Sequence, residues 1–244
     1  MKQDFINKLY TNYSQFKSNS TYNSSEEYYD ELVYEILHSM TVRKESIICD
    51  IGCGNGGKLK SLQKFGYMNL IGIDPLCLET HQPGFSLHPK SIGEYISSVK
   101  AKSVDVFILN AVAEHLYPWI LEETLRSLKE ALTEDGIIIV KSPNAASPYG
   151  GFYQFGDLTH LLALTPNSLK QIAELTGLRI ARCGNEMLPI RQHKGLKRVV
   201  ISSLHRIFLF KLFCESILAF KSIQVLTPNF IAVLNREECS KEFS

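Results

Sequence analysis

Two carboxylates and a glycine-rich turn in the first third of the chain could bind a charged ligand. Asp50 ends an apolar, β-branched run. It is followed by Gly52, Gly54 and Gly57, as expected where the backbone turns sharply and approaches a ligand before a helix predicted at 58–65. The glycine spacing also fits the dinucleotide pattern G-x-G-x-x-G, which binds a pyrophosphate at a helix N-terminus. A carboxylate at Asp50 would repel a pyrophosphate but attract a ligand that carries an ammonium and a sulfonium.

The ligand that meets this charge requirement is S-adenosylmethionine. Roughly twenty residues further on, where nucleotide-binding folds carry their ribose-binding acid, a second apolar run ends in Asp74. We expect Asp74 to bind the ribose hydroxyls, and Asn110, at the end of a later run, to line the reacting methyl group. The predicted cofactor-binding residues are Asp50, Gly52, Cys53, Gly54, Asn55, Asp74, Pro75 and Asn110.

Several motifs resemble those of the class I S-adenosylmethionine-dependent methyltransferases: D-I-G-C-G-N-G, then G-I-D-P, then the run 104–110 with E-H-L at 114–116. The resemblance covers residues 47–188 and returns at 229–235. It implies an α/β fold with a Rossmann-like, seven-stranded, mostly parallel sheet, helices on both faces and a helical insertion before the last strand. It departs from the family at the adenine pocket, where an acid often follows the third strand and this chain has S-L-H-P-K-S-I-G at 86–93.

Alternating strand and helix patterns also favour a parallel sheet. Asp135-Gly136 is expected to close the second of three helices, and Thr165-Pro166 and Gly177 to begin and end the third. These helices are predicted at 25–40, 120–132 and 167–176, and strands at 137–140, 178–183 and 229–235. The resemblance to the family implies that the last strand runs antiparallel beside its predecessor. We expect one domain, 1–244, made of an N-terminal helical cap (1–40), a cofactor-binding core (41–188), a helical insertion (189–228) and the last strand (229–235).

Methyl transfer to an oxygen is an in-line displacement that depends mainly on positioning, helped by a base that takes the hydroxyl proton. Histidine suits this role near neutral pH. His115 follows the strand that ends at Asn110, so we expect it at the carboxyl edge of the sheet, where ligands bind in open α/β folds. The alternative is that His115 is a locally hydrogen-bonded structural feature of the family.

A further pattern, D-L-T-H at 157–160 and L-T-P-N-S-L at 164–169, resembles type 11 and 23 methyltransferases found with bacterial surface-polysaccharide synthesis. That resemblance implies that the loop 142–165 shapes the acceptor pocket. It makes His160 the candidate base and Asp157 its orienting group, with an ordinary loop histidine as the alternative. Aromatic residues of this loop would stack on a sugar or anchor the loop; they are Tyr149, Phe152, Tyr153 and Phe155.

Glu114, His115 and His160 are also an alternative set of divalent-metal ligands. Small-RNA 2′-O-methyltransferases show a similar arrangement, E-x-x-E-H and a later histidine, in which the metal binds ribose hydroxyls. Ala111 replaces the first glutamate here, although two histidines and one carboxylate can still hold a metal with open positions. A divalent metal is thus an option, but we do not expect one.

The composition limits the class of acceptor. The 244 residues are 45% hydrophobic with a formal net charge of +1, which suits one large α/β domain and argues against DNA or general nucleic-acid binding through a basic face. Small-molecule or glycan acceptors are easier to accommodate. No apolar run typical of a signal peptide follows Met1, and the six cysteines form no C-x-x-C pair, so we expect a cytoplasmic protein with reduced thiols.

The insertion 189–228 mixes basic and apolar residues and predicts one or two amphipathic helices. Its functional interpretations are docking on a membrane surface or a partner helix, or a lid over an elongated substrate; the alternative is a helical pair that closes the domain's own core. A transmembrane span is not expected because Arg206, Lys211 and Glu215 interrupt the apolar run 199–220. The basic residues are Lys194, Lys197, Arg198, His205, Arg206, Lys211 and Lys221.

The residues and the resemblance together predict a cytoplasmic S-adenosylmethionine-dependent enzyme. Its expected acceptor is a hydroxyl of a sugar, nucleotide-sugar or glycan intermediate in polysaccharide biosynthesis. A second hypothesis is a lipid-linked or quinone-like acceptor at a membrane, with the insertion as the docking element. A third, from a different class, is a non-catalytic methyltransferase-fold subunit that positions a partner protein.

Overall fold

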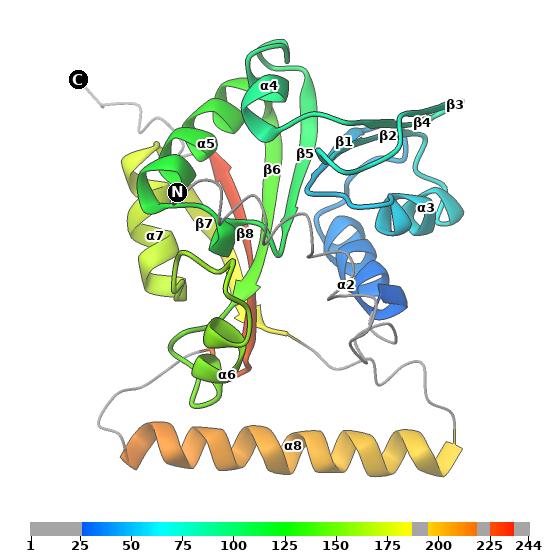
Figure 1. The fold of residues 1–244 in the computed structure, drawn as a ribbon. Helices are drawn as coiled ribbons and strands as arrows, with labels where there is room; N and C mark the ends of the chain where they lie inside the picture. The colour runs from blue at the N-terminus through cyan, green and yellow to red at the C-terminus, as the bar shows by residue number, and fades with distance from the viewer. Residues whose placement is uncertain (1–25, 187–194, 219–224, 237–244) are drawn as a thin grey trace, which may run out of the picture.

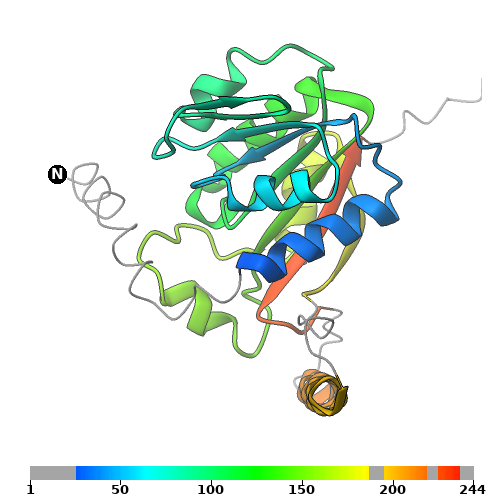
Figure 2. The same cartoon turned by 90° about the vertical axis from the view of Figure 1, so that its right-hand side faces the viewer.

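One mixed β-sheet runs through the molecule, with helices on both of its faces (Figure 1, Figure 2). The computed structural model describes residues 26–186, 195–218 and 225–236. Within these residues the sheet has eight strands in the order β3-β4-β2-β1-β5-β6-β8-β7. They are β1 (Ile47–Ile51), β2 (Asn69–Ile73), β3 (Thr80–Gln82), β4 (Phe85–His88), β5 (Val104–Asn110), β6 (Leu132–Pro143), β7 (Leu178–Asn185) and β8 (Asn229–Arg236).

The centre of the sheet is parallel and its two ends are antiparallel. β1 pairs in parallel with β2 and β5, which pair in the same way with β4 and β6. β8 runs antiparallel between β6 and β7, as predicted for the last strand. Both faces of the central strands are buried, since Phe107 and Leu109 join one core cluster and Val106 and Ile108 the other. This double burial explains why β5 reads as a nearly continuous apolar run.

The predicted seven-stranded, mostly parallel sheet is wrong in its strand count and in the pairing at one edge. The additional strand, β3, pairs antiparallel with β4, and Gln82 lies opposite Phe85. Pro83 and Gly84 form the two-residue turn between them, and Gly84 has a φ of 73°, in the left-handed region that glycine adopts without strain. The proline-glycine pair is therefore the sequence signal of this hairpin.

The helices divide between the two faces (Figure 2). α2 (Glu26–Ser39) and α3 (Gly57–Lys64) cover one face, and α4 (Ile92–Ile96), α5 (Pro118–Ala131) and α7 (Pro166–Leu175) cover the other. α7 begins and ends as predicted: Thr165 and Ser168 form a capping box, Pro166 occupies the first turn, and Gly177 follows the last turn with a φ of 70°.

The helix predicted at 120–132 ends before the position expected for its stop signal. α5 stops at Ala131, and β6 begins at Leu132, which pairs with Val104 of β5. Gly136 lies inside this strand, where an added Cβ atom would be 2.6 Å from Leu132 Cγ. Gly136 therefore permits close packing within the sheet and does not end the helix.

The described part of the insertion consists of one helix, α8 (Gly195–Leu218), and of residues 225–228, which lead into β8. Figure 1 shows α8 below α6 (Gly150–Phe155), beyond the ends of the strands. His205 and Leu212 are buried, whereas Ile207 and Phe210 are exposed. No helix in the described ranges is both long and apolar enough to cross a membrane.

Some expectations fall on residues that lie outside the described ones. They include the part of the N-terminal cap up to residue 25, and also Lys194, Lys221 and Cys239. The other five cysteines carry free thiols.

Candidate active site

The glycine turn after β1 is bonded to the end of β2. Gly52, with a φ of 74°, donates its N–H to Ile73 O at 2.7 Å, and Gly54 N–H donates to Asp74 Oδ2 at 2.9 Å. A Cβ atom added at Gly52 would lie 2.5 Å from Val112 Cγ2, whereas nothing lies within 4 Å of one added at Gly54. Gly52 therefore permits close packing of the turn against Val112, whereas the space beside Gly54 is open to a ligand.

Asp50 lies fully buried beneath this turn and forms an ion pair that the sequence did not suggest. Lys58 Nζ, from the first turn of α3, is 3.2 Å from both carboxylate oxygens. Burial raises the pKa of Asp50, and the Lys58 ammonium opposes that rise. A ligand ammonium would therefore meet a carboxylate that already has a cationic neighbour.

The remaining predicted cofactor residues lie around the same strand ends. The side chain of Asn55 accepts the Gly57 N–H at 3.2 Å, which helps to start α3. Cys53 is buried, with its Sγ 3.6 Å from Gly54 O, and Pro75 is exposed beside Asp74. Together with the glycine turn after β1, these residues lie along the carboxyl edge of the sheet.

Asn110 ends β5 on the other side of β1. The next residue, Ala111, has a φ of 55°, which is strained for a residue with a side chain. Its N–H is held by Lys141 O at 3.0 Å. The sheet therefore fixes the start of the loop that carries Glu114 and His115.

Glu114 joins the loops that follow β5 and β6. Its side chain is buried and accepts the Ser142 hydroxyl at 3.2 Å. Its backbone carbonyl accepts the N–H groups of Leu161 and Leu162 at 2.8 and 3.0 Å. His115 and His160 are brought together by these contacts.

The imidazole rings of His115 and His160 lie edge to face, with their centroids 4.8 Å apart. His160 Nδ1 is 3.1 Å from Tyr153 O, and His115 Nδ1 is 3.1 Å from Thr159 O. Because a carbonyl oxygen only accepts, each Nδ1–H donates a hydrogen bond to it, so the neutral form of each ring has its lone pair on Nε2. This is the tautomer in which Nε2 can accept a proton or bind a metal.

The hydrogen bonds of Asp157 lead to His115 through Thr159, and not to His160, which it was expected to orient. Asp157 accepts the Thr159 hydroxyl at 2.6 Å and the Thr159 N–H at 2.8 Å, and the Thr159 Oγ1 is 3.0 Å from His115 Nδ1. Its distance to His160 Nε2, 3.9 Å, exceeds a hydrogen bond. Burial would raise the pKa of Asp157, but the Thr159 hydrogen bonds and both histidines bring it below the ordinary value.

Lys141 is a functional candidate that sequence reasoning missed. It lies on β6 opposite Asn110 and forms a largely buried ion pair with Glu186, at 2.8 Å. Burial lowers the pKa of Lys141 to about 8, against an ordinary value of 10.5. In the sequence, Lys141 directly follows the apolar run 137–140, and this position could have marked it as unusual. No sequence pattern pointed to its partner Glu186, 45 residues later.

A cavity of about 150 Å³ lies between α6, α8 and the start of β8. Two lining residues contact side chains described above. Tyr153 O is hydrogen-bonded to His160 Nδ1, and Glu186 forms the ion pair with Lys141. His205 of α8 also faces the cavity, and its Nδ1 has no hydrogen-bond partner among the described residues. The cavity thus offers polar groups next to the paired histidines.

Comparison with known protein families finds one match. The family profile described as "Methyltransferase domain" matches residues 25–182. No curated protein sequence gives a significant match.

Solved structures with similar folds come from several organisms. A S-adenosylmethionine-dependent methyltransferase from Archaeoglobus fulgidus is 22% identical, with a TM-score of 0.58 over 89% of this chain and 100% of that one. A chain from the complex between the Haloferax volcanii Trm112 methyltransferase activator and a methyltransferase is 12% identical, with a TM-score of 0.61 over 90% and 95%. The Burkholderia thailandensis 1,6-didemethyltoxoflavin-N1-methyltransferase, solved with S-adenosylhomocysteine, is 10% identical, with a TM-score of 0.57 over 97% and 87%. At these identities the likeness establishes the fold.

Proposed function

This chain belongs to the methyltransferase-domain family and is a S-adenosylmethionine-dependent enzyme, and from that premise we propose that it methylates a hydroxyl of a sugar, nucleotide-sugar or glycan intermediate of polysaccharide biosynthesis. The observation that carries the proposal is the pair of imidazoles, His115 and His160, whose Nδ1 atoms both bond to carbonyl oxygens. A hydroxyl acceptor needs a proton acceptor of this kind, because it is a poor nucleophile until its proton is removed.

The cofactor side of the proposal rests on the glycine turn after β1, which leads into α3. Gly52 lets the turn pack against Val112 of the loop after β5, and the space beside Gly54 is open, so a ligand can approach the backbone there. We assign Asp74, which accepts the Gly54 N–H, to the ribose hydroxyls, and Asp50 to the ammonium group of the ligand. S-adenosylmethionine, when bound there, supplies the electrophilic methyl group.

On the acceptor side, we assign His160 as the base. Its Nδ1–H is donated to Tyr153 O, which fixes the ring and leaves the Nε2 lone pair to take the acceptor's proton. Asp157 and Thr159 position His115 beside it. Cavity residues Tyr153, Glu186 and Asn229, with the exposed Phe152, offer the aromatic faces and polar groups that bind a sugar.

The test is methyl transfer from labelled S-adenosylmethionine to a panel of nucleotide sugars and oligosaccharides. Wild-type protein should form a base-stable methyl ether. His160→Ala should lower kcat by roughly 10²–10⁴-fold with unchanged cofactor affinity, and the matched control His38→Ala, an exposed histidine of α2, should behave as wild type. Undiminished kcat in His160→Ala would remove the base assignment, and an N-methylated or esterified product would remove the hydroxyl acceptor.

The same cluster also supports a second chemistry at this site. The ligand atoms of Glu114, His115 and His160 all lie within 4.8 Å of one another, close enough for a divalent ion. Prolonged chelation distinguishes the two: activity that survives metal removal supports the histidine base. Activity that is lost and restored by Mg²⁺ or Mn²⁺ would instead support metal binding of the acceptor hydroxyl.

A second candidate function is methylation of a lipid-linked or quinone-like acceptor at a membrane surface. The observation that favours it is the outward face of α8, which exposes large apolar side chains opposite the buried His205 and Leu212. These exposed residues include Leu196, Val199, Val200, Leu204, Ile207, Phe210 and Ile217. Exposed Lys197, Arg206 and Lys211 lie on the same helix. An apolar helical face flanked by cations fits an anionic bilayer surface.

Vesicle sedimentation tests this candidate directly. We expect binding to phosphatidylglycerol vesicles that falls with salt and is lost in the variant Ile207→Asp/Phe210→Asp. The control Leu175→Asp changes an exposed leucine at the end of α7 and should bind as wild type. No vesicle binding by the wild-type chain would leave the water-soluble acceptor as the proposal.

A further inference from the structure

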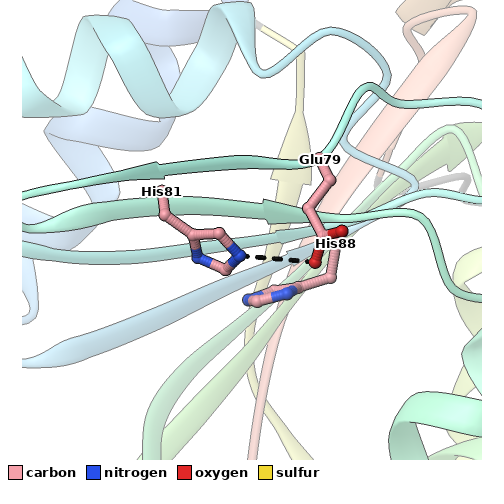
Figure 3. A group of neighbouring side chains, drawn as sticks. All are labelled: Glu79, His81 and His88. Carbon is pink, nitrogen blue, oxygen red and sulfur yellow. Dashed lines mark hydrogen bonds and ion pairs between the residues drawn. The ribbon is translucent and has the colours of Figure 1, made fainter.

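The hairpin β3–β4 gathers a group of potential metal ligands on one of its faces, separate from the cluster of His115 and His160 (Figure 3). Thr80 pairs with Leu87 and His81 with Ser86, so Glu79 lies across from His88. Because strand side chains alternate between faces, Glu79, His81 and His88 share one face with Ser86. Phe85 and Leu87 point the other way, into the core. The sheet therefore fixes the backbone beneath these three side chains.

Their separations are close to those of a metal site. His81 Nε2 is 3.3 Å from Glu79 Oε1, and the ring centroids of His81 and His88 are 5.3 Å apart. Figure 3 shows the three side chains close together, with the His81–Glu79 interaction dashed. One ligand atom from each residue lies within 4.8 Å of the others. Tetrahedral zinc with bonds of about 2.0–2.1 Å would hold its ligand atoms about 3.3 Å apart. One pair already has this spacing, and the exposed Glu79 and His81 side chains can move to complete it.

The chemistry of the set matches a borderline transition metal. Imidazole and carboxylate ligands suit zinc, and both histidines must be neutral to bind it. Ser86 Oγ, 3.1 Å from His88 Nε2, restrains the His88 ring. Outer hydrogen bonds of this kind commonly orient metal-binding histidines.

We propose that Glu79, His81 and His88 form a binding site for a divalent transition-metal ion, with zinc as the ion that fits and water at the fourth position. The site lies at the end of β4, where His88 O accepts the Asp74 N–H at 3.3 Å. An ion there would tie the edge hairpin together next to the segment that carries Asp74. This site uses different residues from the cluster of Glu114, His115 and His160.

Calorimetric titration of the full, untagged and chelator-treated chain with Zn²⁺ tests the site without any assay of activity. His81→Ala and Glu79→Gln change exposed side chains and leave the hairpin backbone intact. We expect each to weaken binding at this site at least about tenfold, since each removes one of three protein ligands. His38→Ala and His160→Ala are the controls and should retain the site. Bound Co²⁺ gives a second readout, a visible spectrum of four-coordinate type that His81→Ala should abolish.

Three results would overturn the proposal. The first is a wild-type chain that binds no Zn²⁺. The second is unchanged Zn²⁺ affinity and stoichiometry in His81→Ala. The third is complete loss of binding in His160→Ala, which would assign the ion to the other cluster. Each of these outcomes concerns metal binding alone, so it is distinguishable from failure of the proposed methylation.

Discussion

The two halves of the candidate site are built from contacts of very different range along the chain. In the cofactor half, Asp50 pairs with Lys58, eight residues away, and Gly54 bonds to Asp74, twenty residues away. In the acceptor half, His115 bonds to Thr159 across 44 residues, and the carbonyl of Glu114 binds Leu161 and Leu162. The first half is one strand-turn-helix-strand unit, whereas the second is assembled from separate loops.

This difference predicts how each half responds to change. The cofactor half depends on backbone shape and two carboxylates, so a single added side chain should block it. The acceptor half depends on hydrogen bonds that orient imidazoles, so substitutions there should reduce turnover while cofactor affinity stays the same. Variants that separate these two effects test the comparison.

The largest effect is expected from Gly52→Val. The new Cβ would lie 2.5 Å from Val112 Cγ2 in a backbone conformation with φ of 74° that valine avoids. We expect loss of measurable S-adenosylmethionine binding, which corresponds to more than about 100-fold, or about 2.7 kcal/mol. Gly54→Ala is the matched control: its φ is also positive but nothing lies within 4 Å, so we expect a loss of only about fivefold, from backbone strain. Equal affinities of the two variants would argue against close packing at Gly52.

Asp50→Asn should weaken cofactor binding by roughly 10–100-fold, because a charge-assisted hydrogen bond contributes about 1.5–3 kcal/mol. Calorimetry with S-adenosylmethionine measures the change. The control Asp105→Asn changes a carboxylate of β5 that bonds to Ile47 N, at the far edge of the sheet. Cofactor affinity that is the same in both variants would mean that Asp50 has no part in attracting the ligand.

Thr159→Val should lower kcat by about tenfold through mispositioning of His115. The substitution keeps the side-chain volume but removes the hydroxyl between Asp157 and His115. We expect an unchanged dissociation constant for S-adenosylmethionine and an altered pH-rate profile. A kcat and profile identical to wild type would show that the Asp157–Thr159 pair serves only the loop.

The smallest effect concerns stability at alkaline pH. The unfolded chain keeps the Lys141 proton to about pH 10.5, whereas the folded chain releases it near pH 8. The unfolded state therefore binds more protons above pH 8, and stability from this group rises with pH. Between pH 7 and 9 the wild type should gain about 1 kcal/mol in unfolding free energy relative to Lys141→Met/Glu186→Gln. Parallel stability curves of the two proteins would contradict the lowered pKa.

The range of the contacts also explains what the sequence could predict. The turn at Gly52 and Gly54 and the cap at Thr165 follow from residues that lie near one another in the chain, and the parallel centre of the sheet follows from the alternation of strand and helix patterns. The hairpin β3–β4 was missed, although Pro83 and Gly84 carried its signal. Its two strands share only three residue pairs at the edge of the sheet, and strands this short show no periodic pattern in the sequence.

The acceptor half could be predicted only in part. The motif resemblance named Glu114, His115 and His160, and the structure brings them together. The resemblance made Asp157 the orienting group of His160, whereas in the folded loop Thr159 lies between Asp157 and His115. The ion pair of Lys141 and Glu186 had no local signal, because β8 lies between the two strands that carry these residues to the same edge.

The central claim is that the glycine turn after β1 binds S-adenosylmethionine, while the pair of His115 and His160 acts on the acceptor hydroxyl. Calorimetric titration with S-adenosylhomocysteine, the demethylated product, and with NAD tests it most directly. We predict one S-adenosylhomocysteine per chain and no NAD binding, with binding lost in Gly52→Val and retained in His160→Ala. Binding of NAD, or S-adenosylhomocysteine affinity in Gly52→Val equal to that of the wild type, would contradict this account.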